Sequence, residues 1–382
     1  MAGAQPTCSR CIMDSTVPGL RLDAQGACQL CHAHDRLDRA YFSGQDPDKK
    51  AAFLATIEKI KREGRGRPYD CILPLSGGGD SSWALVKAVE LGLRPVAYHF
   101  DNGWVSDIGR QNLATMTSKL GVPLKTLSVP WEQLGDAFRA CLEASIPEPC
   151  LPCLVAVFSL AYRAAEIEGL RTVIFSSSPL TEGIAPLGWS YVDGRYLESV
   201  VQAHGQPATL GAVRDFNRLR ARNLLAGALV RRTRVIMLPL YLEWDEPRFK
   251  ERLRSEYGWI DGGKHADCIY TPFRTQLIHD KFGFDLRRLG IAAQVRAGRI
   301  SRARALAWFD DNPMVEDLEN RERVLARLGM SAADYQRIMA APPRSFRDYR
   351  TYYPLIRAMR PLIRQACKRG LLAEHVIDKF ED

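Results

Sequence analysis

Short apolar runs alternate with helical patterns through the middle of the chain. Five runs, each bounded by polar residues, glycine or proline, predict β-strands: DCILPLS, RPVAYHF, LKTLSV, RTVIFSSS and RVIMLPLYL. The stretches between them place apolar residues at helical spacing, in SSWALVKAVELG, GRQNLATMTSKLG, WEQLGDAFRACLEAS and CLVAVFSLAYRAAEIEG. Strands that alternate with helices favour an α/β fold, in which a parallel sheet is sandwiched by helices. Residues 68–245 are expected to form this domain.

The pattern changes on both sides of this domain. Residues 1–40 contain two Cys-x-x-Cys pairs and few large apolar residues, so we expect a small metal-bound module. Residues 41–67 predict a helical linker, because the helical pattern of KKAAFLATIEKIKREGRGRP ends at Gly and Pro. Beyond Glu246 the strand signals stop. There FGFDLRRLGIAAQVRAGRISRARALAWFD and EDLENRERVLARLG predict a helical C-terminal region, residues 246–382.

A glycine-rich loop, SGGGDSS, lies between the first predicted strand and its helix. The first N–H groups of a helix lack internal partners, the helix dipole adds positive charge there, and glycines let the backbone wrap a phosphate closely. The loop is neither a Walker P-loop nor a dinucleotide fingerprint. We expect a phosphate site formed by Ser76, Gly77, Gly78, Gly79, Ser81 and Ser82, with Asp80 as a helix cap or magnesium ligand. Asp101 ends the second strand and is a candidate for Mg²⁺ or ribose.

The N-terminal cysteines have the spacing of a metal site. Cys8, Cys11, Cys28 and Cys31 form a C-x₂-C-x₁₆-C-x₂-C pattern, which predicts a structural zinc ribbon. Because so small a segment lacks a core of its own, the bound metal would supply folding free energy.

A third Cys-x-x-Cys pair begins a predicted helix. Cys150 and Cys153 lie at the start of that helix, whose positive end would lower the pKa of their thiols. With the distant Cys268 they form a candidate ligand set for a second zinc or an iron–sulfur cluster. A role in packing or capping the helix is an equally open interpretation.

The charge balance is basic, with a formal net charge of +9 and a pI of about 9.1. Basic chains often bind nucleotides, nucleic acid or other anions, although a solvated basic surface gives the same balance. The segment from Arg214 to Arg234 contains seven arginines and one acid, and we interpret it as a helix with a basic face. No apolar run approaches the ~20 residues of a membrane helix, and the N-terminus lacks an apolar signal core. We therefore expect a cytoplasmic protein with no membrane partner.

The motifs together resemble a known family. Ser-Gly-Gly-x-Asp-Ser between a strand and a helix resembles the PP-loop of the N-type ATP pyrophosphatases, which are HUP-like α/β proteins. The segments CSRCIMDSTVPGLRLDAQGACQLC, CILPLSGGGDSS, TEGIAPLGW, GGKHADCIYTPF, KFGFDLRRLG and ENRERVLARLGMSAADYQRIMAAPPRSFRDY, in that order, resemble the N-acetyl sugar amidotransferase family over nearly the full length. These are amidine-forming enzymes of bacterial O-antigen and nonulosonic acid biosynthesis. Gly79 departs from the relatives that have lysine there, so any work done by that lysine needs another cation.

The resemblance implies a reaction. An ATP-dependent amidotransferase of this family would adenylate the amide oxygen of an acetamido group on a nucleotide-activated sugar, with Mg²⁺ and release of pyrophosphate. Ammonia would then displace AMP and leave an acetamidino group. Thr181, Glu182 and Gly183 follow the fourth strand and are candidates for binding this second substrate. Catalytic candidates are Asp80 and the polar cluster Lys264, His265 and Asp267 in a glycine-rich loop, for which a merely solvated loop is equally open.

The source of ammonia and the competing functions also follow from the sequence. Cys141 and Cys367 lack the flanking glycines of a class-I glutaminase nucleophile, and the chain begins Met-Ala rather than with cysteine. We therefore expect a separate glutaminase subunit that delivers ammonia through a channel, as the resemblance also implies. The first alternative is a PP-loop sulfurtransferase, which would thiolate tRNA or use Cys150 or Cys153 as a persulfide on a small molecule. The second alternative is a zinc-ribbon protein that binds nucleotide without catalysis.

Overall fold

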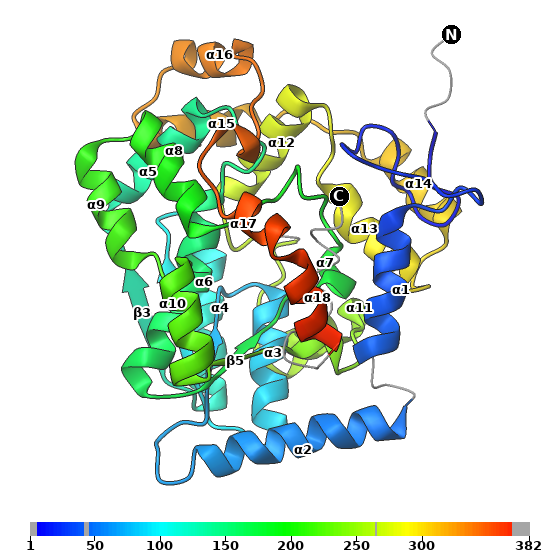
Figure 1. Ribbon diagram of the computed structural model, residues 1–382, viewed down its shortest axis with the longest axis vertical. Coiled ribbons are helices and arrows are strands. Elements are labelled where there is room, and N and C mark those ends of the chain that lie inside the picture. The colour runs from blue at the N-terminus through cyan, green and yellow to red at the C-terminus, as the bar shows by residue number, and fades with distance from the viewer. Residues whose placement is uncertain (1–5, 42–45, 264–265, 369–382) are drawn as a thin grey trace.

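A five-stranded parallel sheet forms the centre of the molecule (Figure 1). The computed structural model describes residues 6–41, 46–263 and 266–368. The strand order is β3-β2-β1-β4-β5, and every neighbouring pair is parallel. The strands are β1 (Cys71–Pro74), β2 (Pro95–Asp101), β3 (Leu124–Ser128), β4 (Thr172–Phe175) and β5 (Arg234–Met237). All five predicted strands are confirmed.

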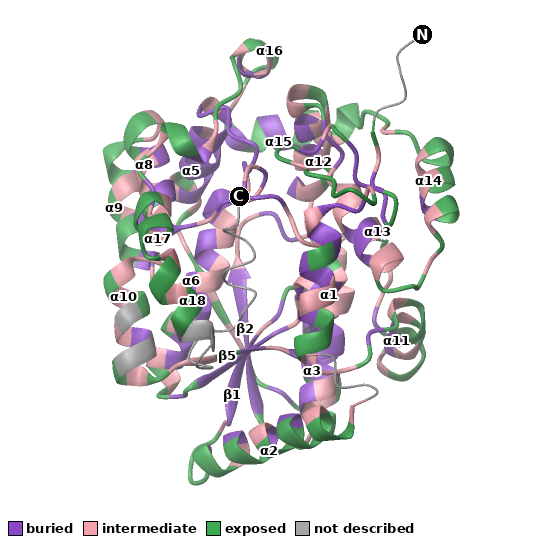
Figure 2. Ribbon diagram, turned by 45° about the vertical axis from the view of Figure 1, so that its right-hand side comes forward, coloured by how far each residue is buried: buried purple, intermediate pink, exposed green. Residues whose placement is uncertain are grey.

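Helices cover both faces of the sheet, as the continuous burial of β1, β2 and β4 requires (Figure 2). Ile72 belongs to one apolar core and its neighbour Leu73 to another, because successive side chains of a strand point to opposite faces. The first core includes residues of α5 (Trp131–Glu143) and α6 (Leu151–Glu168). The second includes residues of α3 (Gly79–Glu90) and α4 (Asp107–Leu120). The predicted sandwich is therefore confirmed.

The N-terminal part contributes two helices, α1 (Gln29–Tyr41) and α2 (Pro47–Glu63). The predicted linker helix is α2, which lies below the other elements in Figure 1. It does more than connect, because Phe53, Ile57 and Ile60 are buried in the second core. The ring of Phe53 stacks on that of Tyr241, with centroids 4.9 Å apart.

The basic segment after α8 (Gly194–His204) is not the single helix that its sequence predicted. Helix α9 (Pro207–Phe216) ends where Asn217 adopts an extended backbone, and α10 (Ala221–Ala226) continues into a π-turn, η1 (Gly227–Arg231). The buried Asn217 amide donates to the Gly194 carbonyl (2.9 Å) and to Glu198 (2.7 Å). This side-chain bonding replaces the next helical turn.

Most arginines of this segment face acidic partners. Glu198 lies within 3.8 Å of Arg214 and 2.6 Å of Arg220, and Glu166 lies within 3.7 Å of Arg218 and 3.0 Å of Arg231. Arg234 lies 3.4 Å from Glu63. The acids come from other parts of the sequence, so three glutamates offset part of the charge of the basic run.

The other described elements are helical. Beyond Glu246 this confirms the predicted helical region. After β4 comes the short α7 (Pro179–Glu182), and after β5 the 3₁₀ turn η2 (Leu238–Leu240). The C-terminal region consists of α11 (Glu246–Arg252), η3 (Leu253–Tyr257), α12 (Tyr270–Phe282), α13 (Arg287–Arg296), α14 (Arg302–Asp311), α15 (Leu318–Leu328), α16 (Ala332–Ala340), η4 (Phe346–Asp348), α17 (Tyr353–Ala358) and α18 (Arg360–Lys368). Within the described part of the chain, no helix combines the length and apolarity that crossing a membrane takes.

Candidate active site and metal centre

The glycine loop connects β1 to α3 and is held in place by residues far away in the sequence. Gly77 has φ +89°, and a methyl group there would collide with the Gly109 carbonyl oxygen of α4. Its own carbonyl accepts hydrogen bonds from Asn112 Nδ2 (3.1 Å) and Trp259 Nε1 (3.1 Å). Neither Asn112 nor Trp259 is predictable as a loop contact from the sequence, because neither lies near the loop in sequence or belongs to a motif.

The serines of the loop serve its own shape. The Ser76 and Ser81 hydroxyls lie 3.2 Å apart, and Ser76 Oγ accepts from the Gly78 amide at 3.2 Å. Ser82 is fully buried, and its hydroxyl has no hydrogen-bond partner among the described residues. Ser76 and Ser81 are therefore internal braces of the loop as well as candidate phosphate donors.

The start of α3 has the properties of an anion site. Its N-cap residue is Gly78, which provides no side-chain cap, and the first helical hydrogen bond runs from the Ser82 amide to the Gly78 carbonyl. The amides of Gly79, Asp80 and Ser81 therefore precede the first bonded turn, where the positive end of the helix dipole lies.

The strand order brings other predicted residues to the same edge of the sheet. The chain continues from β1 and from β4 in opposite directions along the sheet, and parallel α/β sheets bind ligands in the crevice outside the carboxyl ends of such a pair. Below, the crevice means this position at the carboxyl ends of β1 and β4. Asp101 ends β2 at this edge, where its carboxylate accepts from the Gly103 amide at 3.0 Å. The next residue, Asn102, donates to Cys153 Sγ at 3.2 Å.

The glycine-rich loop before α12 reaches the phosphate loop. Lys264 and His265 lie outside the described residues. Asp267 is described, and its carboxylate oxygen lies 3.0 Å from where a side chain on Gly78 would begin. Ser106 fixes this position, because its amide donates to the Asp267 carbonyl (3.0 Å) and its hydroxyl to the Ala266 carbonyl (2.6 Å). The structure therefore brings Asp267 and the glycine loop together.

A buried histidine lies beneath this group. His99 of β2 has Nδ1 2.9 Å from the Leu75 carbonyl, directly before the loop. Burial lowers the pKa of His99, while the Leu75 carbonyl and the charges of Asp101 and Asp267 oppose that shift. A neutral imidazole can support the loop without adding charge. Its position inside an apolar strand gave no signal in the sequence.

Cys150, Cys153 and Cys268 do not form a group whose sulfurs lie close enough to share a metal in the described structure. Cys150 is the N-cap residue of α6, and Cys268 forms an isolated antiparallel bridge with Val105. Burial raises the pKa of Cys150 well above its ordinary value, that of Cys153 to about 12, and that of Cys268. The expectation that the helix end lowers the pKa values of Cys150 and Cys153 was therefore wrong, because desolvation of the thiolate outweighs the effect of the helix dipole. A second metal or cluster at these residues stays a prediction.

The predicted second-substrate residues lie at the carboxyl end of β4. Thr181 and Glu182 belong to α7, and the Thr181 hydroxyl donates to the Ser178 carbonyl at 3.1 Å. Gly183 has φ +90°, and a methyl group there would collide with the Leu289 carbonyl oxygen of α13. These three residues therefore lie after β4, where α13 packs against α7 and Gly183.

The four N-terminal cysteines form a compact group. Among the described residues it is the one His/Cys/Asp/Glu group whose ligand atoms lie close enough to share a metal, all within 4.8 Å of one another. The closest sulfur pairs, Cys8–Cys31, Cys11–Cys28 and Cys28–Cys31, are 3.8, 3.7 and 3.6 Å apart. A tetrahedral shell with metal–sulfur bonds of ~2.3 Å has edges of ~3.8 Å. All four side chains are buried, so the group fits a closed tetrahedral metal site.

A lysine from α11 approaches the start of α3. A methyl group on Gly79 would lie 3.4 Å from Lys250 Cε and 3.5 Å from the Trp259 ring. The Lys250 ammonium lies 3.0 Å from Glu246 and 3.9 Å from Asp261, and its side chain is 18% exposed. A cation near Gly79 was expected from the sequence, but Lys250 could not be identified as that cation, because α11 lies in another region of the chain.

Comparisons with known proteins bear on the C-terminal region first. Residues 263–362 match the family described as "LPS biosynthesis protein WbpG-like, C-terminal domain". These residues are similar to that domain. This match supports the resemblance to the N-acetyl sugar amidotransferases, and it includes Asp267 and Cys268.

Two further likenesses cover more of the chain. It is 23% identical over 251 residues to an uncharacterized protein of Methanocaldococcus jannaschii, MJ1599, which is 65% of this chain and 74% of that protein. It is also similar to the NMN synthetase structure from Francisella tularensis, with 11% identity, a TM-score of 0.27, and coverage of 75% of this chain and 97% of that chain. A TM-score this low adds nothing to the sheet order described above.

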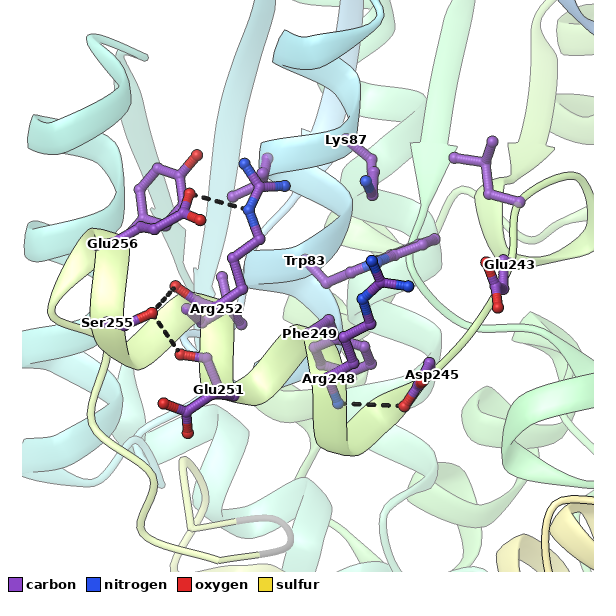
Figure 3. A pocket seen from close by; sticks show the side chains of 14 residues that line it. Trp83, Lys87, Glu243, Asp245, Arg248, Phe249, Glu251, Arg252, Ser255 and Glu256 are labelled. Atoms are coloured by element: carbon purple, nitrogen blue, oxygen red, sulfur yellow. Dashed lines mark hydrogen bonds and ion pairs between the residues drawn. The ribbon is translucent and has the colours of Figure 1, made fainter.

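A pocket of about 830 Å³ lies beside α3 (Figure 3). Trp83 and Lys87 line it from α3, and Phe249 and Arg252 line it from α11. None of the predicted site residues lines it. The pocket is therefore separate from the crevice at the strand ends, and its size does not identify the active site.

Proposed function

We propose that this protein is an ATP-dependent amidotransferase that converts an acetamido group of a nucleotide-activated sugar into an acetamidino group. The observation that carries the proposal is the approach of Asp267 to the uncapped glycine loop, at the sheet edge where Asp101 ends β2. The WbpG-like match of the region that provides Asp267 supports a role in lipopolysaccharide biosynthesis.

The chemistry explains why such a site is needed. An amide is a poor electrophile, because its nitrogen donates into the carbonyl and oxide is a poor leaving group. Attack of the amide oxygen on the α-phosphorus of ATP forms an oxygen–phosphorus bond and releases pyrophosphate. Ammonia then adds to the carbon, loses its extra protons to base, and AMP departs with the original oxygen. Donors fixed on the developing phosphate charge are the main catalytic resource for the first step.

The residues divide between the two substrates. In this proposal the amides of Gly77 to Ser81 bind the pyrophosphate end of ATP, and the loop sits at the start of α3. Asp101 and Asp267 would hold Mg²⁺, which neutralises phosphate charge. Thr181, Glu182 and Gly183 would bind the acetamido sugar at the end of β4. The four-cysteine group would hold a structural Zn²⁺.

We infer that Lys250 supplies the cation beside the loop, and we predict that Lys250→Ala raises the KM for ATP about tenfold. A tenfold change corresponds to about 1.4 kcal/mol, a moderate value for one partly buried charge. Initial rates of ATP–pyrophosphate exchange measure this effect. Lys87→Ala, which removes a lysine from the last turn of α3, far from its start, is the matched control and should leave the KM unchanged.

A rescue variant separates charge from packing. The Gly79→Lys, Lys250→Ala double variant should recover part of the lost affinity, because removing the Lys250 chain clears the space beside Gly79. If Lys250→Ala exchanges pyrophosphate with an unchanged KM for ATP, Lys250 is only a structural ion-pair partner of Glu246.

Mass spectrometry of the products tests the proposed function. Protein, ATP, Mg²⁺ and ammonium are incubated with a panel of CMP- and UDP-linked acetamido sugars. We expect one sugar to become lighter by about one dalton, because NH replaces O, together with equimolar AMP and pyrophosphate. Asp267→Asn should abolish the shift while the protein stays folded. ATP use without any sugar change would refute the proposal.

The same assay addresses the partner and the alternative. We expect glutamine to replace ammonium only when a separate glutaminase is added, and amidine formation from glutamine by this chain alone would contradict that. A gain of about sixteen daltons with a sulfur donor would indicate a sulfurtransferase, and tRNA would then be the next substrate tested. The raised pKa of Cys153 disfavours a persulfide mechanism, because the thiolate is the reactive form.

A further inference from the structure

Three arginines of the C-terminal region hold the four-cysteine module. Arg296, the last residue of α13, donates from Nε to Cys31 Sγ (3.4 Å) and from Nη2 to Cys11 Sγ (3.3 Å). Arg302 of α14 donates from Nε to the carbonyls of Cys8 (3.0 Å) and Cys11 (2.9 Å). The contact therefore joins the first residues of the chain to a region nearly three hundred residues later.

Arg288 adds a third contact from the other end of α13. Its Nη1 donates to the Ile12 carbonyl at 2.8 Å and lies 3.1 Å from the Asp14 carboxylate. One end of this helix is thus tied to two of the cysteines and the other end to the segment that follows Cys11.

The positive charge of the Arg296 guanidinium requires a negative charge beside it. Four thiolates around one divalent metal ion have a net charge of −2, and a guanidinium facing the sulfurs offsets part of it. Arg296 Nη1 is buried without a hydrogen-bond partner among the described residues. A guanidinium nitrogen buried in this way is stable only where an opposite charge compensates it, and here only the sulfurs lie within hydrogen-bonding reach of Arg296 among the described side chains.

Helix α13 connects the four-cysteine module to α7, which follows β4. Figure 1 shows α1, α7 and α13 side by side, and both α1 and α13 pack against α7. The Leu289 carbonyl of α13 lies so close to Gly183 that only glycine fits. Cys31 is itself part of α1. The module therefore reaches α7 by two routes, through α1 directly and through Arg296 and α13.

We propose that the metal-loaded cysteine module is a clamp that positions α7 and the residues after it at the sugar-binding end of the crevice. Arg296 is the positioning residue that transmits the state of the metal site to α13. The clamp rests on the proposed function only in what α7 binds, since the contacts themselves do not depend on the reaction. Its ligand is a tetrahedral thiophilic metal ion such as Zn²⁺.

The test compares Arg296→Met and Arg296→Lys with Arg304→Met, which changes an exposed arginine of α14. We expect Arg296→Met to lose metal to a chelator about 10- to 100-fold more readily than wild type, the usual effect of removing a group that supports metal ligands. Hydrogen exchange should rise at residues 176–183 and stay unchanged in α3. Arg296→Lys should be intermediate, and Arg304→Met should match wild type.

Kinetics add a readout that a general loss of stability would not give. The KM for the acetamido sugar should rise with Arg296→Met, while the KM for ATP in pyrophosphate exchange stays within about twofold. If Arg296→Met loses its metal but hydrogen exchange at residues 176–183 is unchanged, the clamp is refuted. If Arg296→Met fails to fold, Arg296→Lys decides by the same measurements.

Failure of the clamp and failure of the proposed function give different results. Wild-type protein that forms no amidine refutes the function, and the metal and hydrogen-exchange measurements still judge the clamp. If wild-type protein forms amidine, but hydrogen exchange at residues 176–183 is the same in Arg296→Met as in wild type, only the clamp is refuted.

Discussion

Gly77→Ala is expected to reduce ATP–pyrophosphate exchange by at least about a hundredfold, because the phosphate loop can no longer take its shape. The alanine methyl would collide with the Gly109 carbonyl oxygen, and φ of +89° is a conformation that alanine rarely adopts. Relief of the collision requires movement of the backbone that also accepts hydrogen bonds from Asn112 and Trp259. The loop, α4 and the segment after η3 would then shift together.

Gly211→Ala is the matched control for this variant. Gly211 lies within α9, and a methyl group there would meet nothing within 4 Å. Alanine favours a helix over glycine by about 1 kcal/mol, so this variant should be active and slightly more stable to heat. Full exchange activity in Gly77→Ala would show that the loop does not bind the reacting phosphates in the observed conformation.

Cys28→Ser is expected to remove the metal and to cause the largest loss of stability. The Cys28 sulfur lies 3.7 Å from that of Cys11 and 3.6 Å from that of Cys31, so its loss opens one corner of the tetrahedron. Metal binding contributes about 10–16 kcal/mol to the folding of small zinc peptides, and a three-sulfur site retains only part of that. The remaining thiolates would also leave Arg296 with less compensating charge.

Elemental analysis of metal per chain and thermal unfolding measure this outcome. Cys71→Ala serves as the control, since Cys71 is fully buried in β1 and belongs to the other apolar core. That variant should lose some packing energy but keep its metal. One metal ion per chain in Cys28→Ser, with unfolding as in wild type, would contradict the assignment of Cys28 as a ligand.

Local pattern was sufficient for the elements of the fold. Short apolar runs predicted all five strands. The signal is explained best for β1, β2 and β4, because parallel strands buried on both faces leave a nearly continuous apolar run. The cysteine spacing predicted a group that does lie within ligand distance. The glycine loop was recognisable for the same reason, because its strand, turn and helix are consecutive in the chain.

Local pattern failed where a side chain acts on a distant residue. The arginines from Arg214 to Arg234 predicted one basic helix, but Asn217 interrupts it by bonding to Gly194. Glu166 and Glu198 each lie near two of these arginines and offset part of their charge. The thiol pKa values at α6 were predicted from the helix dipole alone. Burial by residues from other elements reversed their direction.

By itself, then, the sequence determined which strands and helices follow one another along the chain, the glycine loop and the four-cysteine group, because each depends on neighbours along the chain. Only the tertiary structure decided what surrounds them. Asn112 and Trp259 fix the loop, Lys250 approaches Gly79, and Arg296 faces the sulfurs, each from a helix or turn that no motif connects to its target. Such contacts depend on how whole elements pack, and packing is decided by the sum of many distant apolar contacts.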